Sequence, residues 1–422
     1  MSLDSSTRAQ VVATAVVAIL VALAPHHSTA GDPVLVVPGQ PVPISLTIEL
    51  PKHDIEFGNM DTVALTEIGG DEASTVGTVM PSVQADGTVG EGFRLATVIP
   101  AARTHFEQRR FRLASRERHR IGFSLKELNA KSLRMDDHRQ RPVFAYNHGV
   151  IVRDDLPKNE HRRSRSCYIH PVWGLHGEVL TDDFPKDHYH HHGVFWTWPY
   201  IDLPDDDRGP YDSWQGSKIH QRFHQWLARS VGDAAGLIAV ENHWIAQADE
   251  PRHVMTERVW MQAYPAVDGG RAIDIRLVLN PTESPVMLWG RGGKSYGGLT
   301  VRFIGRPNKD QVITVPDGRI KTDLKVTRLR WVDFTRHFEG APNRSGGTVM
   351  IHPEHPDYPP TWLVRHYGPQ CIGWPGVKPK TFEPGKPIRL TYRLWIHASD
   401  ADTSAIQQAY DAYAAGAKAH WH

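Results

Sequence analysis

The residues best suited to chemistry are concentrated in one stretch, Asp187-His188-Tyr189-His190-His191-His192-Gly193, which continues into Val194, Phe195 and Trp196. Four imidazoles and one carboxylate stand within six positions, a composition that no purely structural strand requires. Imidazoles at this density serve as metal ligands or as an acid–base group near neutral pH. The stretch therefore predicts a functional site, and the alternative is a solvated loop whose rings hydrogen-bond only to their neighbours.

The direction of these rings depends on the backbone that carries them. In an extended strand, alternate side chains face opposite sides, so His188, His190 and His192 would share one face and the residues between them the other. An H-x-H pair on one strand can direct two imidazoles at one point. His188 and His190 are therefore the predicted metal ligands if a cofactor is present, and a divalent metal ion is the cofactor that they would suit.

A second group of polar residues follows an expected strand at 348–351. It begins with His352-Pro353-Glu354-His355-Pro356, and Trp362, Arg365, His366 and Tyr367 come just after it. Prolines directly after His352 and His355 stiffen the backbone and lower the entropy cost of fixing the two rings. The same prolines could simply end a strand, and the sequence does not separate the two interpretations.

Two carboxylates fall inside apolar stretches that read as strands, Glu241 in 237–245 and Glu257 in 254–260. An inward-facing carboxylate would have a raised pKa and could act as a general acid or base. An outward-facing one is a surface charge, which is the favoured interpretation for each residue taken alone.

The composition excludes several classes of function. A formal net charge of +1 over 422 residues lacks the basic footprint of a nucleic-acid-binding protein. With 40% hydrophobic and 23% charged residues the chain can bury a core, and its length suits two or three domains. The 35 glycines and 31 prolines indicate many turns, which favours a β-rich fold over a helical one.

The N-terminus has the features of a secretory signal. Arg8 precedes an apolar run over 11–24, and Ser28-Thr29-Ala30 is a small-x-small cleavage site. The run is shorter than the about 20 residues that a transmembrane helix needs. We therefore predict a signal peptide over 1–30 and a secreted or periplasmic protein, with an uncleaved anchor as the alternative. No later segment is apolar enough to span a membrane.

The two cysteines, Cys167 and Cys371, allow two interpretations. In an exported protein they could form one disulfide bond, and two buried thiols are nearly as well supported, because pairing depends on a geometry that the sequence does not give.

Period-two alternation predicts long antiparallel strands. It is clearest over 44–50, 271–279 and 388–397, where every second residue is apolar. We predict a mainly β protein with a small immunoglobulin-like β-sandwich over 31–121 and a large antiparallel β-sandwich over 122–422. An arginine-rich stretch over 103–120 is interpreted as a solvated edge strand or interdomain segment rather than a site for an anionic polymer.

Only the C-terminus has a helical pattern. Thr403 or Ser404 is the expected N-cap, and apolar residues recur at helical spacing after it. They are Ile406, Ala409, Tyr410 and Tyr413.

Taken together, several motifs resemble the secreted bacterial family labelled "methane oxygenase PmoA", over about residues 140–400. The motifs are Asp187-His188-x-His190-His191-x-Gly193, Tyr296-Gly297-Gly298-Leu299-x-x-Arg302, His352-Pro353-x-x-Pro356-x-x-Pro359-Pro360-x-Trp362, Arg365-x-Tyr367-Gly368 and Tyr392-Arg393-Leu394. The chain departs from the family at His192, where arginine is expected, and at His355, where asparagine is more common. By analogy of fold, the large sandwich is compared with the galactose-mutarotase-like supersandwich.

The first functional hypothesis is an exported carbohydrate-active protein, in which histidine acid–base chemistry acts on a glycan or sugar derivative. The predicted catalytic residues are Asp187, His188, His190, His191 and His352, and the predicted substrate-binding residues are Arg302, Trp362, Arg365 and Tyr367. A second hypothesis is a metal-dependent oxidoreductase with copper or iron on His188 and His190, for which His352 is an optional third ligand. A third is a glycan-binding protein without catalysis. The expected partner is a small-molecule or glycan substrate, with no nucleic acid.

Overall fold

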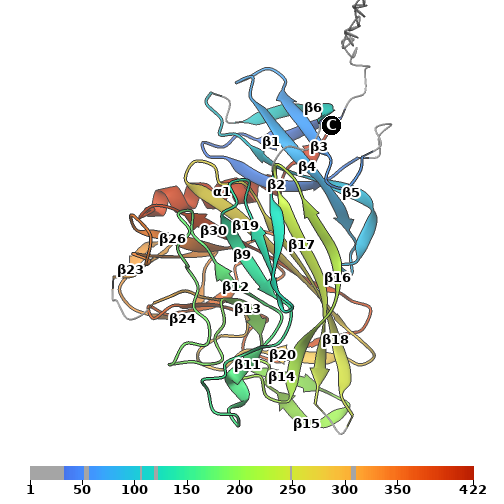
Figure 1. The fold of residues 1–422 in the computed structure, drawn as a ribbon, viewed down its shortest axis with the longest axis vertical. Coiled ribbons are helices and arrows are strands. Elements are labelled where there is room, and N and C mark those ends of the chain that lie inside the picture. The colour runs from blue at the N-terminus through green and yellow to red at the C-terminus, as the bar shows by residue number, and fades with distance from the viewer. Residues whose placement is uncertain (1–32, 52–56, 105–106, 118–121, 248–249, 306–309) are drawn as a thin grey trace, which may run out of the picture. The chain divides into compact units, whose positions relative to one another are not determined.

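The computed structural model describes residues 33–51, 57–104, 107–117, 122–247, 250–305 and 310–422. In these ranges the protein is mainly β, with several antiparallel sheets and one α-helix near the C-terminus, as predicted (Figure 1). No helix in the described ranges is long and apolar enough to cross a membrane. The predicted signal peptide lies outside the described residues.

The first sheet, sheet 1, has seven strands in the order β2-β5-β4-β3-β6-β1-β31. Its last strand comes from the C-terminus, where Trp421 pairs with Leu35 of β1. The bounds are β1 Val34–Pro38, β2 Ile44–Glu49, β3 Thr62–Glu67, β4 Ser74–Val83, β5 Val89–Ile99, β6 Gln108–Glu117 and β31 His420–Trp421.

Two nine-stranded antiparallel sheets form the large sandwich. Sheet 2 has the order β24-β27-β28-β21-β13-β12-β9-β8-β7, and sheet 3 has the order β16-β17-β18-β19-β30-β26-β25-β22-β23. The strands of sheet 2 are β7 Ser124–Asn129, β8 Ser132–Asp136, β9 Pro142–Asn147, β12 Tyr168–Val172, β13 Val194–Thr197, β21 Gly298–Arg302, β24 Leu324–Arg328, β27 Thr361–Val364 and β28 Pro369–Gly373. Those of sheet 3 are β16 Ile219–Val231, β17 Gly236–Ala246, β18 Arg252–Ala263, β19 Gly270–Pro281, β22 Val312–Val315, β23 Gly318–Ile320, β25 Trp331–Arg336, β26 Ser345–Ile351 and β30 Ile388–His397.

Smaller elements lie beside the sandwich. They are the four-stranded sheet β15-β14-β20-β29, the ribbon β10-β11 and a 3₁₀ turn, η1. Their bounds are β14 Tyr200–Leu203, β15 Asp206–Tyr211, β20 Val286–Trp289, β29 Lys380–Phe382, β10 Ile151–Val152, β11 Ser164–Arg165 and η1 His161–Arg163.

The main core lies between sheets 2 and 3. Ile275 of β19 and Leu390 of β30 are among the buried residues that face Ile169 of β12 and Val194 of β13 across it. Burying one such aliphatic side chain contributes about 1.5–3 kcal/mol. The period-two patterns predicted for residues 271–279 and 388–397 are therefore confirmed, because their apolar faces are the ones that line this core.

The remaining face of sheet 3 supports sheet 1 and the helix. Trp260 of β18 and Leu237 of β17 form an apolar cluster with Val98 of β5. Helix α1, Thr403–Gly416, packs Ile406, Tyr410 and Tyr413 against Trp331 and Met350 of sheet 3, and Figure 1 shows it beside β26 and β30.

The start of α1 differs slightly from the prediction. Its N-cap is Asp402, whose carboxylate accepts a hydrogen bond from the backbone N–H of Ala405 at 2.8 Å. Thr403 and Ser404, the predicted caps, already lie within the helix. Asp402 takes the position because its short carboxylate reaches an otherwise unpaired N–H of the first turn.

The arginine-rich stretch is not an edge strand. Strand β6 lies between β3 and β1, so both of its edges are paired. Arg109 points into the protein, where its Nε lies 2.7 Å from Oε1 of Glu67 and both side chains are buried. Arg110 and Arg112 are exposed, and Arg118 and Arg120 lie outside the described residues.

Candidate functional site

The histidine stretch is folded as turns rather than as a strand. The backbone N–H of His188 donates to the carbonyl of Pro185 at 2.9 Å, and the N–H of His191 donates to the carbonyl of His188 at 2.9 Å. Strand β13 begins only at Val194. The chain therefore reverses its direction where the strand interpretation required it to stay extended.

These turns gather three imidazoles. The rings of His188 and His191 stack with centroids 4.7 Å apart and an interplanar angle of 12°, and His190 meets both at steep angles, 5.5 Å and 4.6 Å away. His192 instead places its Nδ1 2.8 Å from Oδ1 of Asp183. The prediction that His188, His190 and His192 share one face of a strand is therefore wrong, because the turns abolish the two-residue period on which it depended.

Two predicted residues from distant parts of the chain join this cluster. The ring of Tyr367 stacks on His188 with centroids 5.2 Å apart at 15°, so His188 is held between Tyr367 and His191. The Nη2 atom of Arg302 lies 3.1 Å from Oδ1 of Asp187, and the same guanidinium lies 5.0 Å from the centre of the Tyr367 ring. Oδ2 of Asp187 in turn lies 3.2 Å from Nδ1 of His188.

The order of strands in sheet 2 explains this convergence. Strand β21 lies between β13 and β28. Val194, the first residue of β13, pairs with Val301 near the end of β21, and Arg302 pairs with Pro369, the first residue of β28. The segment before β13, the end of β21 and the turn before β28 therefore meet at the same ends of these three neighbouring strands.

A close approach of the backbone fixes where the histidine stretch enters the sheet. A Cβ atom at Gly193 would lie 2.1 Å from the carbonyl oxygen of Ile169 on β12. Only glycine fits at this contact without displacing the backbone. Gly193 therefore sets the point at which the turns end and β13 begins.

The cluster has one imidazole that water reaches and two that it does not. The side chain of His188 is 35% exposed and that of Asp187 is 20% exposed, whereas His190 and His191 are buried. Burial, followed by the positive charge of His188, lowers the pKa of His190 to about 3, and burial also lowers the pKa of His191 well below its usual range. Both buried rings are therefore neutral near pH 7, and His188 is the ring that a solute can reach.

Aromatic and apolar side chains form the floor of the cluster. Tyr168, Phe195 and Cys371 project from the face of sheet 2 that is opposite the core, where they pack with Trp214. The Trp214 ring lies 5.7 Å from His191 and 4.6 Å from Tyr296. The site therefore lies on the outer face of sheet 2, above a small apolar cluster of its own.

A partly buried carboxylate beside the cluster, that of Asp183, was not predicted. Asp183 lies beside His192, and the Tyr168 hydroxyl donates to its Oδ2 at 2.8 Å. Burial raises the pKa of Asp183 to about 6. The only signal in the sequence is the Asp182-Asp183 pair shortly before the histidines.

Two predicted site residues lie elsewhere. Trp362 is fully buried in the sandwich core, where its ring N–H donates to the carbonyl of Leu329 at 2.8 Å, so it cannot contact a substrate. His352 projects from the outer side of sheet 3 and lies 5.4 Å from the ring of Tyr413. No contact between His352 and the three clustered imidazoles occurs among the described residues.

Arg365 lies at the edge of the cluster. Its Nη1 is 3.2 Å from Oδ2 of Asp323, whose other oxygen, Oδ1, accepts a hydrogen bond from the backbone N–H of His366. Burial raises the pKa of the neighbouring Tyr367 to about 12, and the charges of Arg302 and Arg365 oppose that rise. Arg365 therefore acts on the cluster through its charge.

The two strand carboxylates have opposite orientations. Glu257 faces the core, fully buried, and accepts hydrogen bonds from Gln221, Asn242 and Trp244 at 2.7–2.8 Å. Burial raises its pKa. Glu241 faces away from the core, but it is only 7% exposed and pairs with Arg258 at 2.7 Å, so it belongs to a buried ion pair and is not the predicted surface charge. For Glu257 the favoured outward interpretation is wrong, because its neighbours supply the donors that a buried carboxylate needs.

The predicted metal ligands are close together but lack a third donor. The rings of His188 and His190 lie 5.5 Å apart at 75°. His188 and His191 are nearly parallel, so their lone pairs lie in separate planes and cannot converge on one ion. Across the described part of the chain, one set of three donors lies within 4.8 Å, and it belongs to other residues, His224, Glu241 and His243.

The two cysteines are separate buried thiols. Burial raises the pKa of each to about 12, which keeps both protonated near neutral pH. The structure therefore supports the second of the two interpretations drawn from the sequence.

Comparison with known proteins gives a family without a function. A family model described as "Family of unknown function (DUF6807)" matches residues 135–411, more than half of the chain. No curated protein matches the chain. The match includes every residue of the histidine cluster, and it excludes every strand of sheet 1.

Proposed function

We propose that this chain, which belongs to the DUF6807 family of unknown function, is an exported carbohydrate-active enzyme that uses His188 as a general acid–base on a glycan or sugar derivative. The observation that carries the proposal is the arrangement of Asp187, His188 and Tyr367. A partly exposed imidazole has a carboxylate 3.2 Å from its Nδ1 and an aromatic ring stacked on its face.

The carboxylate prepares His188 for proton transfer. Nδ1 itself is buried, and the charge of the carboxylate beside it stabilises the imidazolium that forms when Nε2 takes up a proton. Nε2 is then the nitrogen that removes a proton from the sugar or returns one to it. General acid–base catalysis of this kind contributes a rate factor of about 10²–10⁴. Hydrolysis, elimination and epimerisation all require such a transfer.

Side chains around His188 suit a sugar. The ring of Tyr367 is half-buried, and its exposed part can contact the apolar face of a pyranose. Arg365 and His366 lie at the edge with Asp323 and offer polar groups to hydroxyls. Arg302 is 1% exposed, which leaves it the role of holding Asp187 and Tyr367 rather than contacting the sugar.

A metal-dependent oxidoreductase is the second candidate. Metal ions bind imidazoles only in the unprotonated form, and burial keeps His190 and His191 in that form near neutral pH. His188 and His190 would be the ligands, and copper or iron bound there would supply redox chemistry. The missing third donor makes this candidate weaker than acid–base catalysis.

A screen for product formation tests the first proposal. Neutral and acidic oligosaccharides and oxidised sugars are incubated with wild type, His188→Gln and the control His420→Gln, whose ring lies on β31, and products are detected by mass spectrometry. We expect a product with wild type and the control and its loss in His188→Gln. Saturable binding without any product would instead support the glycan-binding hypothesis.

A further inference from the structure

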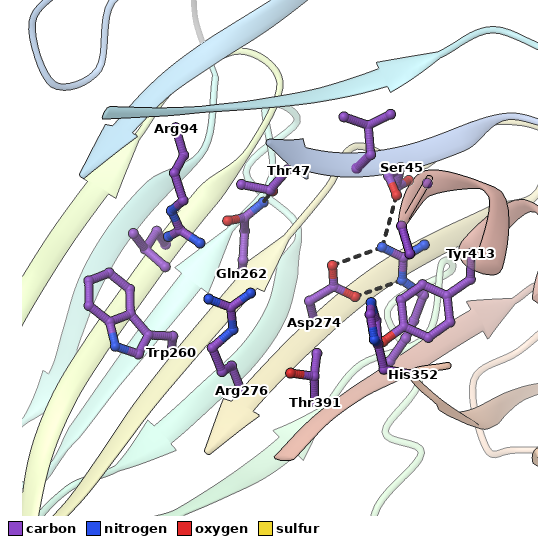
Figure 2. Close-up of a pocket in the computed structure, with 15 residues that line it drawn as sticks. Ser45, Thr47, Arg94, Trp260, Gln262, Asp274, Arg276, His352, Thr391 and Tyr413 are labelled. Atoms are coloured by element: carbon purple, nitrogen blue, oxygen red, sulfur yellow. Dashed lines mark hydrogen bonds and ion pairs between the residues drawn. The ribbon is translucent and has the colours of Figure 1, made fainter. Parts of the chain in front are cut away.

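A polar hollow lies far from the histidine cluster, between sheet 1 and the outer face of sheet 3 (Figure 2). Strands β2 and β5 cover it from one side, β18, β19 and β30 line the other, and the end of α1 closes it near Tyr413. Its volume is about 100 Å³. Three guanidiniums, those of Arg94, Arg276 and Arg393, line it together with a single carboxylate, that of Asp274.

The carboxylate is fully engaged by one of the three arginines. Arg393 donates from Nε and Nη2 to the two oxygens of Asp274 at 2.6 and 2.8 Å, and also to the carbonyl of Ser45 at 2.9 Å. Its guanidinium lies 4.1 Å from the centre of the Tyr413 ring. Asp274 and Arg393 therefore balance each other, which leaves two positive charges in the hollow.

Arg94 is buried without a matching acceptor. It is 6% exposed, its Nε donates to the carbonyl of Pro81 at 3.0 Å, and its Nη2 has no hydrogen-bond partner. The nearest carboxylate, Glu49, is 4.0 Å from Nε and its side chain is 58% exposed. Leaving a buried charged donor unpaired destabilises the folded state, so the position calls for an acceptor from outside the chain.

Arg276 brings a second charge to the same space. Figure 2 shows the side chains of Arg94 and Arg276 extending toward each other from opposite walls, with Thr47 and Gln262 beside them. Burial and the charge of Arg276 lower the pKa of Arg94 to about 10. No carboxylate pairs with Arg276 among the described residues. An oxyanion between the two guanidiniums would satisfy Nη2 of Arg94 and remove this repulsion.

We propose that the hollow is a binding site for an oxyanion, which arrives either as the carboxylate of an acidic sugar or as a free inorganic anion. Arg94 and Arg276 provide the charge, and Thr47 and Gln262 provide neutral polar groups. A hollow of about 100 Å³ holds the anionic group alone. A second hollow of about 270 Å³ shares Arg276, His352 and Thr391 with it and has room for the rest of a sugar.

The proposed site is formed jointly by the region that matches the family and by sheet 1. Arg276 and His352 lie in the region that matches the family, whereas Thr47 and Arg94 belong to sheet 1, outside the match. The proposal is independent of catalysis at His188, because it concerns a different face of the sandwich.

Calorimetric titration of the full chain tests the site. The probes are glucuronate, inorganic phosphate and the neutral sugar glucose, titrated into wild type, Arg94→Gln, Arg276→Gln and the control Arg319→Gln. Arg276 is only half-buried, so its variant stays informative if Arg94→Gln folds poorly. The control arginine is 51% exposed and pairs with Asp400.

We expect saturable binding of glucuronate that weakens at least tenfold in Arg276→Gln and Arg94→Gln and is unchanged in Arg319→Gln. Phosphate binding with the same variant pattern would identify the source as an inorganic anion and would also support the site. The proposal is overturned if neither anion binds saturably, if both variants bind like wild type, or if glucose binds as tightly as glucuronate.

Discussion

Arg302 and Asp187 are 115 positions apart in the sequence, yet Nη2 of the guanidinium lies 3.1 Å from Oδ1 of the carboxylate. Arg302 is 1% exposed, and its Nε and Nη1 have no hydrogen-bond partner in the described part of the chain. The same guanidinium covers the Tyr367 ring. The buried guanidinium of Arg302 therefore positions Asp187 and Tyr367, which both contact His188.

Replacing this arginine should destabilise the protein and disorder the site. In Arg302→Gln, Asp187 loses its counter-charge and Tyr367 loses its cation contact. Breaking a fully buried pair costs about 3–5 kcal/mol, and because the Asp187 side chain keeps 20% exposure we expect about 2–3 kcal/mol. Urea denaturation measures this loss.

The matched control for Arg302→Gln is Arg328→Gln. Its pair with Asp357 spans 3.0 Å, and the arginine side chain is 54% exposed. An exposed pair contributes about 0–1 kcal/mol. Equal losses in the two variants would show that Arg302 has no special structural role.

Acid should destabilise the protein through His190. Its pKa is about 3 in the folded state and 6.5 in its ordinary state, so folding favours the neutral ring. The stability that depends on the neutral ring is complete above pH 6.5 and is lost as the pH falls from 6.5 toward 3, by up to about 1.4 kcal/mol per pH unit. The free energy of unfolding, measured by denaturation at each pH from 7.5 to 4.5, should fall less with decreasing pH in His190→Gln than in wild type. A parallel pH dependence in the two proteins would contradict the assignment.

Replacing the core carboxylate of Glu257 with an amide should destabilise the protein. Gln221, Asn242 and Trp244 all donate to Glu257, so Glu257→Gln would turn an NH₂ group toward one of these donors. A buried donor left unsatisfied costs about 1–3 kcal/mol. We expect a loss of that size in urea denaturation, with Glu354→Gln, whose side chain is 83% exposed, as the comparison. A Glu257→Gln variant as stable as wild type would show that the network is not needed.

Metal content separates the two catalytic candidates. The protein, purified without a histidine tag and incubated with copper, iron or zinc, is compared with His188→Ala/His190→Ala and with the control His224→Ala/His243→Ala. Acid–base catalysis predicts that removing His188 and His190 changes the bound metal by less than one equivalent. Loss of one full equivalent in that variant alone would favour the oxidoreductase.

The long strands could be predicted because one face of each is buried. Strand β30 spans the predicted 388–397, since five apolar residues at alternate positions line the core there. The same rule failed at residues 187–192. Pro185 accepts a turn hydrogen bond and Gly193 passes close to β12, and these local contacts override the alternation that an isolated strand would show.

The site was predicted in part. Arg302 and Tyr367 were proposed from their motifs, and the order β13-β21-β28 brings them to His188. Trp362 and His352 belong to the same motif block but lie on different sheets. His352 follows β26 of sheet 3, whereas Trp362 lies on β27 of sheet 2 and faces the core. The approach of Arg94 to Arg276 had no signal in the sequence, since it depends on how sheet 1 packs on sheet 3.

Chemical rescue of His188→Ala tests the central claim most directly. With the best substrate from the product screen, we expect His188→Ala to lose turnover by about 10²-fold or more. Added imidazole should restore turnover in proportion to its concentration, because the missing ring was partly open to solvent. Asp187→Asn should not respond to imidazole. Turnover by His188→Ala at the wild-type rate would contradict the account.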